Sequence, residues 1–139
     1  MKKLPQTIFF GLLLLACSKK STSQSQKINE LYQKWQLTDV ERTSSEEDAP
    51  KIDYKSKNLF LTFHKDGIID FNLDVNACSG KFREEVNQRL IIKGTDIICT
   101  QACCDSVKLN YHEVKKYEIN NKTLKLYTDK EIFHLELAK

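Results

Sequence analysis

The segment from Leu59 to Leu73, LFLTFHKDGIIDFNL, constrains the fold of this chain more than any other. Every second position is apolar on both sides of Lys65-Asp66-Gly67. Such alternation predicts half-buried β-strands, and Asp-Gly between two alternating runs is a strong signal for a β-hairpin. We therefore expect an antiparallel hairpin whose apolar face packs against the core of a strand-rich domain.

Further alternating segments cover most of the rest of the chain. A half-buried strand is predicted in residues 34–41, and a second hairpin is predicted around Asn87-Gln88. Residues 115–137 are expected to form three strands separated by short turns. Residues 42–57 are polar and contain a proline, so we expect a long loop there.

Residues 107–116, VKLNYHEVKK, are the one helix candidate of substantial length within the domain. Asp105-Ser106 can cap its N-terminus, and Val107, Tyr111 and Val114 would lie on one helix face. The order of strands, one short helix and further strands predicts an α+β, strand-rich fold. We expect a small, mainly antiparallel sheet or a partly open barrel, stapled by disulfides.

Residues 1–16 have the features of a bacterial lipoprotein signal peptide. Two lysines precede the apolar run Ile8–Leu15, which is too short for a permanent membrane helix of about 20 residues. The run ends in Leu14-Leu15-Ala16-Cys17, which resembles a lipobox. This resemblance implies cleavage before Cys17, thioether diacylation of its sulfur and, in many bacteria, N-acylation. Two or three acyl chains hold a protein on a membrane almost permanently.

The mature protein is expected to consist of a flexible tether, residues 17–26, and one domain, residues 27–139. Without Lys2 and Lys3, the 22 Lys and Arg residues fall to 20, against 19 Asp and Glu. No basic cluster with interleaved aromatic residues remains, so the composition argues against a nucleic-acid partner. No acidic run follows Cys17, which favours the periplasmic face of a bacterial membrane.

Four cysteines remain besides Cys17, namely Cys78, Cys99, Cys103 and Cys104. An even number of cysteines in a small domain of an oxidising compartment predicts disulfides. Pairing Cys103 with Cys104 requires a strained ring and is disfavoured. Cys78 would then pair with Cys103 or Cys104, which closes a loop of about 25 residues and contributes about 3 kcal/mol in the chain-entropy model. A zinc site is not expected, because Cys78 has no partner at C-x₂₋₄-C spacing.

The titratable residues form no recognisable catalytic arrangement. His64, His112 and His134 are scattered and are predicted to lie on the solvated surface. Glu84 and Glu85 are adjacent carboxylates, but neighbouring residues of a strand point to opposite faces. No nucleophile stands with a base and an orienting group, and no glycine-rich phosphate loop occurs. The sequence predicts neither an enzyme nor a protein that requires a metal or a cofactor.

Several short motifs follow one another in a characteristic order. They are Trp35-Gln36-Leu37, the turn from Phe63 to Gly67, the N-x-x-x-G-x-aromatic segment from Asn76 to Phe82, Thr100-Gln101-Ala102-Cys103, Tyr117-Glu118-Ile119 and Leu124-Lys125-Leu126. This order resembles the META domain, the HslJ-like family of bacterial envelope proteins, over residues 35–137. Two departures are the Asp74-Val75 pair, where the family often has Gly-Cys, and a T-x-x-A-C-like segment one residue shorter.

The resemblance to META domains implies a structural or interaction role linked to envelope or stress functions, with no defined chemistry. The partners would be the membrane, through the anchor, and an unidentified protein or small molecule. The position of Cys103 in the family implies that Cys78 pairs with Cys103 and Cys99 with Cys104. Two alternatives remain open, a lipocalin-like small-molecule-binding barrel and a lysozyme-inhibitor-like lipoprotein.

Overall fold

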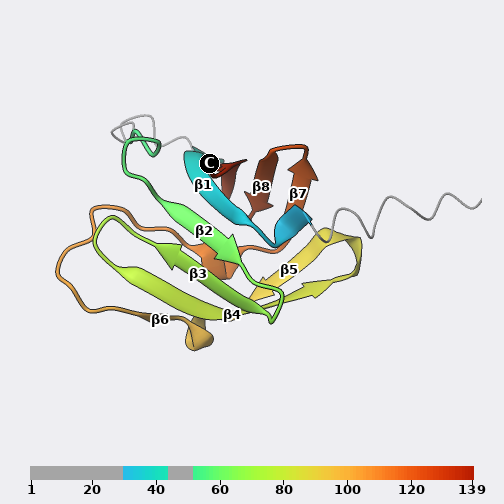
Figure 1. Cartoon of the computed structure of the whole chain (residues 1–139), viewed down its shortest axis with the longest axis horizontal. Helices are drawn as coiled ribbons and strands as arrows, with labels where there is room; N and C mark the ends of the chain where they lie inside the picture. Colours follow the sequence, from blue (N-terminus) through green and yellow to red (C-terminus); the bar gives the residue numbers. More distant parts are fainter. Residues whose placement is uncertain (1–29, 44–51) are drawn as a thin grey trace, which may run out of the picture.

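The computed structural model describes residues 30–43 and 52–139. The strands are β1 (Lys34–Arg42), β2 (Phe60–Phe63), β3 (Ile68–Asn72), β4 (Ala77–Glu85), β5 (Arg89–Ile92), β6 (Ile98–Cys99), β7 (Lys116–Asn120), β8 (Thr123–Tyr127) and β9 (Glu131–Leu137). Three 3₁₀ turns lie between them: η1 (Val86–Gln88), η2 (Gly94–Asp96) and η3 (Tyr111–Glu113). The regular secondary structure of the described residues is thus almost entirely β-strand (Figure 1).

The strands form an antiparallel barrel of eight strands in up-and-down order. Consecutive strands pair from β1 to β5 and from β7 to β9, β5 pairs with β7, and β9 closes the barrel on β1. β6 is an additional short strand that pairs with the first half of β4, on the same edge of β4 whose second half pairs with β5. The expectation of a small, strand-rich and mainly antiparallel fold is confirmed, although the barrel is closed and not partly open. Its wall is least complete between β5 and β7, where Arg89 opposite Lys116 is the one register pair.

Both predicted hairpins are present. β2 and β3 pair with Leu61 opposite Phe71. In the turn between them, Gly67 has a φ of 83°, a conformation that glycine adopts without strain. β4 and β5 pair across the turn that contains Asn87-Gln88. Residues 116–137 form β7, β8 and β9 in consecutive antiparallel pairs, as their alternation predicts.

The predicted helix in residues 107–116 is wrong, because residues 52–139 contain no α-helix and this segment contains only η3. Val107, Tyr111 and Val114 are nevertheless buried, with exposed fractions of 1%, 1% and 3%. The ring of Tyr111 packs against Phe71 and Phe133, with centroids 5.1 Å and 4.9 Å away. The helix-like spacing of these apolar residues therefore reflects contact with the barrel, not a local helix.

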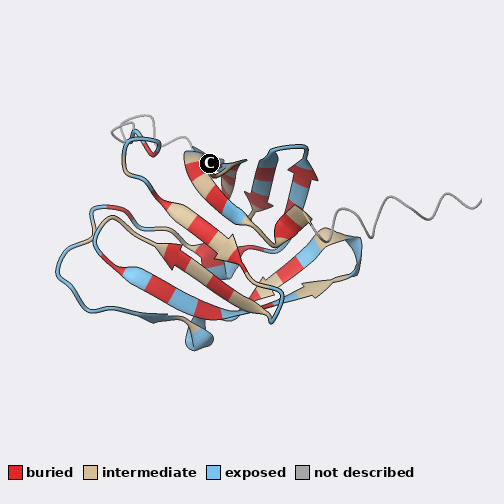
Figure 2. Ribbon diagram, in the orientation of Figure 1, coloured by how far each residue is buried: buried red, intermediate tan, exposed pale blue. Residues whose placement is uncertain are grey.

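Large side chains fill the interior of the barrel. Buried residues alternate with more exposed ones along the strands (Figure 2). Trp35, Tyr111 and Phe133 are exposed by 0%, 1% and 0% of their surface. The indole Nε1 of Trp35 donates a hydrogen bond to the carbonyl of Leu31 at 3.0 Å, so its polar atom is satisfied inside the core. The interior is a packed core, as in other small barrels.

Gly80 lies where β4 is crossed closely by the segment after η2. A Cβ atom at this position would lie 2.9 Å from Cγ1 of Ile97 and 3.5 Å from the carbonyl oxygen of Asp96. We expect Gly80→Ala to destabilise the domain by about 1–2 kcal/mol in urea unfolding, because the two segments must separate. Ser79→Ala, on the exposed face, should change stability by less than about 0.5 kcal/mol. Equal stability of both variants would contradict this packing argument.

Candidate functional site

A cleft of about 990 Å³ lies at the end of the barrel that carries the β2–β3 and β4–β5 turns. We call it the barrel-end cleft. Aromatic, acidic and basic side chains line it, among them Tyr32, Lys65, Phe82, Glu84, Lys116 and Tyr117. Ligand sites often occupy the mouths of β-barrels and commonly have volumes of about 300–1,000 Å³. The barrel-end cleft therefore has the position and size of a ligand site.

Glu84 occupies an inward-facing position at this end of β4. Cys78 and Phe82 are buried on the same face of the strand, and Glu84 follows in their register. The hydroxyl of Tyr117 on β7 donates a hydrogen bond to Oε1 of Glu84. The hydroxyl of Tyr32, just before β1, donates a longer hydrogen bond of 3.4 Å to Oε2. Glu84 thus places a carboxylate at the mouth of the barrel, at a position where the alternation along β4 predicts an inward-facing apolar residue.

Both tyrosines remain protonated hydrogen-bond donors around neutral pH. Burial raises the pKa of Tyr117, and the hydrogen bond to Glu84 raises it further. Burial followed by the negative charge of Glu84 raises the pKa of Tyr32. Ionisation of either hydroxyl would place a second negative charge beside Glu84. The two tyrosines therefore hold the Glu84 carboxylate in place without neutralising it.

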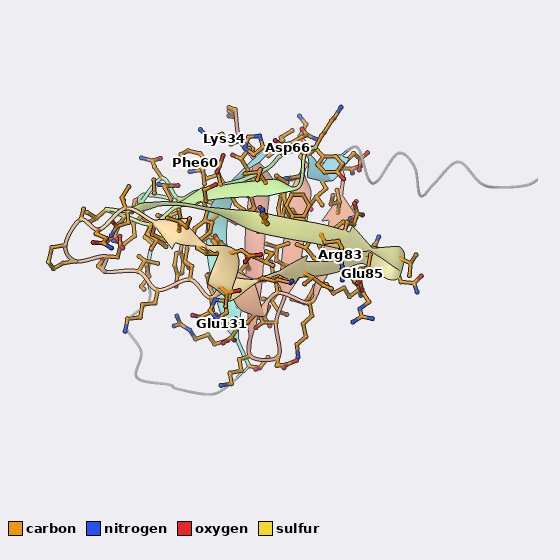
Figure 3. All side chains as sticks on the ribbon, turned by 90° about the horizontal axis from the view of Figure 1, so that it is seen from below. Lys34, Phe60, Asp66, Arg83, Glu85 and Glu131 are labelled. Carbon is orange, nitrogen blue, oxygen red and sulfur yellow. A yellow bond between two sulfur atoms is a disulfide. The ribbon has the colours of Figure 1, made fainter. Side chains whose placement is uncertain are left out.

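Glu85, the neighbour of Glu84, projects from the opposite face of β4, as expected for adjacent residues of a strand, and lies at the rim of the barrel-end cleft. Its Oε1 lies 2.9 Å from Nη2 of Arg83, and its Oε2 lies 3.9 Å from Nη1 of Arg89. Figure 3 shows Arg83 and Glu85 together at this end of β4. Glu84 has no such ion pair among residues 30–43 and 52–139. The two carboxylates therefore differ in orientation and in partners.

Neither cysteine pairing left open by the sequence is correct. The structure pairs Cys78 with Cys99 and Cys103 with Cys104, which is the arrangement that the ring-strain argument disfavoured. Cys78 on β4 lies directly opposite Cys99 on β6, with Cα atoms 4.0 Å apart. The register of β4 and β6 thus places Cys78 and Cys99 opposite each other, so they form one disulfide. The two remaining cysteines, which are adjacent and exposed, form the other. The general expectation of disulfides in the domain is confirmed.

Asn76 holds residues 99–106 in place through hydrogen bonds. We call this segment, which carries the two exposed cysteines, the cysteine loop. Asn76 Nδ2 donates to the carbonyl of Ala102 at 2.9 Å and to Oδ2 of Asp105 at 2.6 Å. Its Oδ1 accepts from Thr100 Oγ1 at 2.8 Å and from the Ala102 N–H at 2.9 Å. Asp105 in turn accepts from the backbone N–H groups of Val75 and Asn76. The side-chain amide of Asn76 is therefore a structural pin, which fixes the cysteine loop through four hydrogen bonds.

A second carboxylate, Asp74, fixes the end of the cysteine loop. It accepts hydrogen bonds from the hydroxyl and the N–H of Ser106, and Lys57 Nζ lies 3.5 Å away. The Ser106 hydroxyl, helped by the backbone N–H, holds the pKa of Asp74 well below its usual range. Because this pKa is lower in the folded than in the unfolded state, the contact stabilises the fold above the usual aspartate pKa. That contribution is lost as the pH falls towards the folded-state pKa.

The histidines lie apart from the barrel-end cleft. His64 Nε2 is 2.8 Å from Asp70, and His134 Nε2 is 3.2 Å from Glu41. The side chains of His64 and His112 are 43% and 46% exposed, which confirms their predicted surface positions, whereas His134 is 27% exposed and partly covered. No group of three His, Cys, Asp or Glu side chains in the described ranges is placed to hold a metal ion.

The predicted signal peptide, Cys17 and the tether lie outside the described residues. Within the residues that the structure describes, no helix is both long and apolar enough to cross a membrane. The predicted polar loop in residues 42–57 is also only partly covered, since residues 44–51 are not described.

Comparison with known proteins supports the fold. No protein-family model matches the chain, and no curated protein has a matching sequence. Among solved structures, the chain is similar to a DUF4847 family protein from Bacteroides vulgatus ATCC 8482, with a TM-score of 0.53 and 12% sequence identity. The match covers 81% of this chain and 98% of the other. At this identity the likeness concerns the fold alone, a small antiparallel β-barrel.

Proposed function

We propose that this chain is a lipid-anchored protein of the bacterial envelope, and that its barrel acts as a binding module and not as an enzyme. The lipobox-like sequence at Leu14–Cys17 supports the anchor. One observation supports the binding role: the barrel-end cleft contains an inward-facing carboxylate, Glu84, held by the hydroxyls of Tyr32 and Tyr117. A cleft with aromatic walls and a few converging polar groups is typical of a ligand site.

A lipocalin-like role is the second candidate, and the strand order favours it. Lipocalins are up-and-down barrels of eight strands, which is the order found here. The side chains of Trp35, Tyr111 and Phe133 fill the interior, so a ligand would bind at the barrel-end cleft instead of inside the barrel. This candidate and the first therefore predict the same ligand position.

Kinship with META domains remains a proposal that rests on the order of the sequence motifs. The structure gives a physical reason for one of these motifs, the N-x-x-x-G-x-aromatic segment. Asn76 belongs to the hydrogen-bond network of the cysteine loop, Gly80 lies in a close packing contact, and Phe82 is in the core. A lysozyme-inhibitor-like role is the third candidate. A muramidase inhibition assay separates it from the others, because a binding module for small molecules should leave the enzyme fully active.

A thermal-unfolding screen tests the binding role. The full chain, purified from the envelope in a non-ionic polyoxyethylene detergent, is mixed with a panel of small polar molecules. We expect at least one ligand class to raise Tm of the wild-type protein and to lose much of this effect in Tyr117→Phe, because the variant keeps only the long hydrogen bond from Tyr32 to orient Glu84. A panel without any stabilising ligand would contradict the proposal, as would ligands that stabilise both proteins equally.

Lipid anchoring leads to a prediction for Cys17. In Cys17→Ser, we expect the chain to leave the membrane fraction and to lose incorporation of an alkyne-labelled fatty acid, because serine has no sulfur for the thioether bond. Ser21→Ala, a small change in the same tether, should keep both properties. A Cys17→Ser chain that still carries label would show that another residue is acylated.

A further inference from the structure

The Glu84 carboxylate has hydrogen-bonding capacity that the protein leaves unused. An ionised carboxylate can accept about four hydrogen bonds, and the described residues supply two, both from neutral hydroxyls. Glu84 is half-buried at the mouth of the barrel and has no ion pair within the described ranges. Carboxylates withdrawn from water are normally matched by a positive charge. A ligand can therefore supply the positive charge that Glu84 lacks.

Aromatic rings surround the same carboxylate. Tyr32, Phe82 and Tyr117 all line the barrel-end cleft. The rings of Tyr32 and Phe82 are 6.3 Å apart between centroids, and Phe82 packs edge-on against Phe63 at 5.0 Å, which holds it in place. Aromatic faces attract cations through their quadrupole, and clusters of them recognise quaternary ammonium groups. Aromatic walls and a carboxylate thus favour the same kind of ligand.

The basic side chains of the cleft are mostly committed to other partners. Arg83 pairs with Glu85 at 2.9 Å. Lys116 pairs with Glu118 at 2.7 Å and lies 5.5 Å from the ring centroid of Tyr127. Of the charged side chains that line the cleft from the strands, Glu84 is the one without an ion pair within the described ranges. Lys65 and Asp66 on the β2–β3 turn also have no ion pair there, but their charges are opposite and sum to zero.

We propose that the barrel-end cleft binds an organic cation, a quaternary ammonium or alkylammonium group, with Glu84 as its counter-charge and Tyr32 and Phe82 as its aromatic walls. Tyr117, which is 1% exposed, contributes its hydroxyl to Glu84 and not its ring face to the ligand. This inference rests on the binding role proposed above and names the class of ligand. The cation sits against the two unused positions of the carboxylate, while Tyr32 and Tyr117 keep the carboxylate oriented. The volume of about 990 Å³ is sufficient for a small ammonium compound with a polar substituent.

Choline and its neutral carbon analogue, 3,3-dimethyl-1-butanol, provide a matched pair of probes. The two molecules have nearly the same shape, but only choline carries a charge. Each is titrated into the isotope-labelled full chain in a non-ionic polyoxyethylene detergent, and NMR follows the backbone amides of Tyr32, Glu84 and Tyr117. We expect choline to shift these amides in a saturable manner and to bind at least tenfold more tightly than the neutral analogue.

Two variants identify the carboxylate responsible. Glu84→Gln should weaken choline binding at least tenfold, because the amide keeps the shape but loses the charge. Glu41→Gln removes the same charge from an exposed side chain near the other end of β1, outside the cleft, and should change the affinity less than twofold. Unfolding curves of both variants, together with an unchanged spectrum outside the cleft, establish that each protein is folded. Equal effects of the two variants would overturn the assignment of Glu84.

The remaining outcomes separate this inference from the proposed function. Equal binding of choline and the neutral analogue at the cleft overturns the cationic class but leaves a binding role for the cleft. Shifts at the cleft with other polar molecules of the screen, and none with choline, have the same meaning. Absence of any shift at the cleft with either probe, combined with an unproductive screen, overturns both the ligand class and the binding role.

Discussion

Replacing Asn76 with alanine is expected to lower the free energy of unfolding by about 3–5 kcal/mol, since each lost hydrogen bond contributes about 0.5–1.5 kcal/mol and one to a charged group up to about 3. The variant loses four side-chain hydrogen bonds, including the one to the Asp105 carboxylate. Asn76 is 7% exposed, so water does not readily replace these partners. Urea unfolding of the variant and the wild-type chain measures the difference.

Hydrogen exchange distinguishes the loss of the Asn76 hydrogen bonds from a general loss of packing. The N–H of Ala102 donates to Asn76, so its hydrogen exchange should accelerate strongly in Asn76→Ala. Asn110→Ala is a suitable control, because Asn110 precedes η3 without a side-chain capping bond; we expect a change within about 0.5 kcal/mol. An Asn76→Ala protein as stable as this control would show that the network around the cysteine loop does not hold the domain together.

Removal of the Cys78–Cys99 disulfide should cost about 3 kcal/mol in the chain-entropy model, whereas removal of the Cys103–Cys104 disulfide should cost far less. The first bond joins residues 21 positions apart and restrains β6 against β4, while the second joins neighbours and closes no further chain segment. The paired variants Cys78→Ser/Cys99→Ser and Cys103→Ser/Cys104→Ser are compared by urea unfolding under non-reducing conditions.

Thiol counting accompanies this comparison. Each double variant of the lipidated protein should contain no free thiol, because the two cysteines that remain in the barrel are a pair in the structure and the sulfur of Cys17 carries the proposed thioether. Free thiols in freshly purified Cys103→Ser/Cys104→Ser would indicate that Cys78 and Cys99 have other partners. Equal stability losses in the two double variants would likewise contradict the assignment of a structural bond to Cys78–Cys99 and a local one to Cys103–Cys104.

The strands are the part of the fold that local sequence predicts well. The alternation in residues 59–73 and the Lys65-Asp66-Gly67 turn act between neighbours in the chain, so they specify β2 and β3 without knowledge of the rest. The helix prediction in residues 107–116 failed because Tyr111 and its apolar neighbours are buried by distant residues such as Phe71 and Phe133. Spacing alone does not distinguish a helix face from a segment that packs on a barrel.

The candidate site was mostly hidden from sequence reasoning, although one signal was present. The series Cys78, Gly80, Phe82 and Glu84 places a carboxylate in the inward register of a predicted strand, which marks an exception to the apolar pattern. The partners of Glu84 are not local, since Tyr32 and Tyr117 are 52 and 33 residues away in the sequence. Their meeting at one mouth depends on closure of the barrel.

The sequence by itself determined the strand-rich class, the two hairpins, the three C-terminal strands and the expectation of disulfides, because alternation, turn residues and cysteine number are local or compositional properties. It also supplies the lipobox-like segment on which the anchor proposal rests. Only the tertiary structure decided the closure of β9 on β1, the pairing of Cys78 with Cys99 and the partners of Glu84. Each of these depends on which distant segments lie side by side, and strand register in three dimensions sets that arrangement.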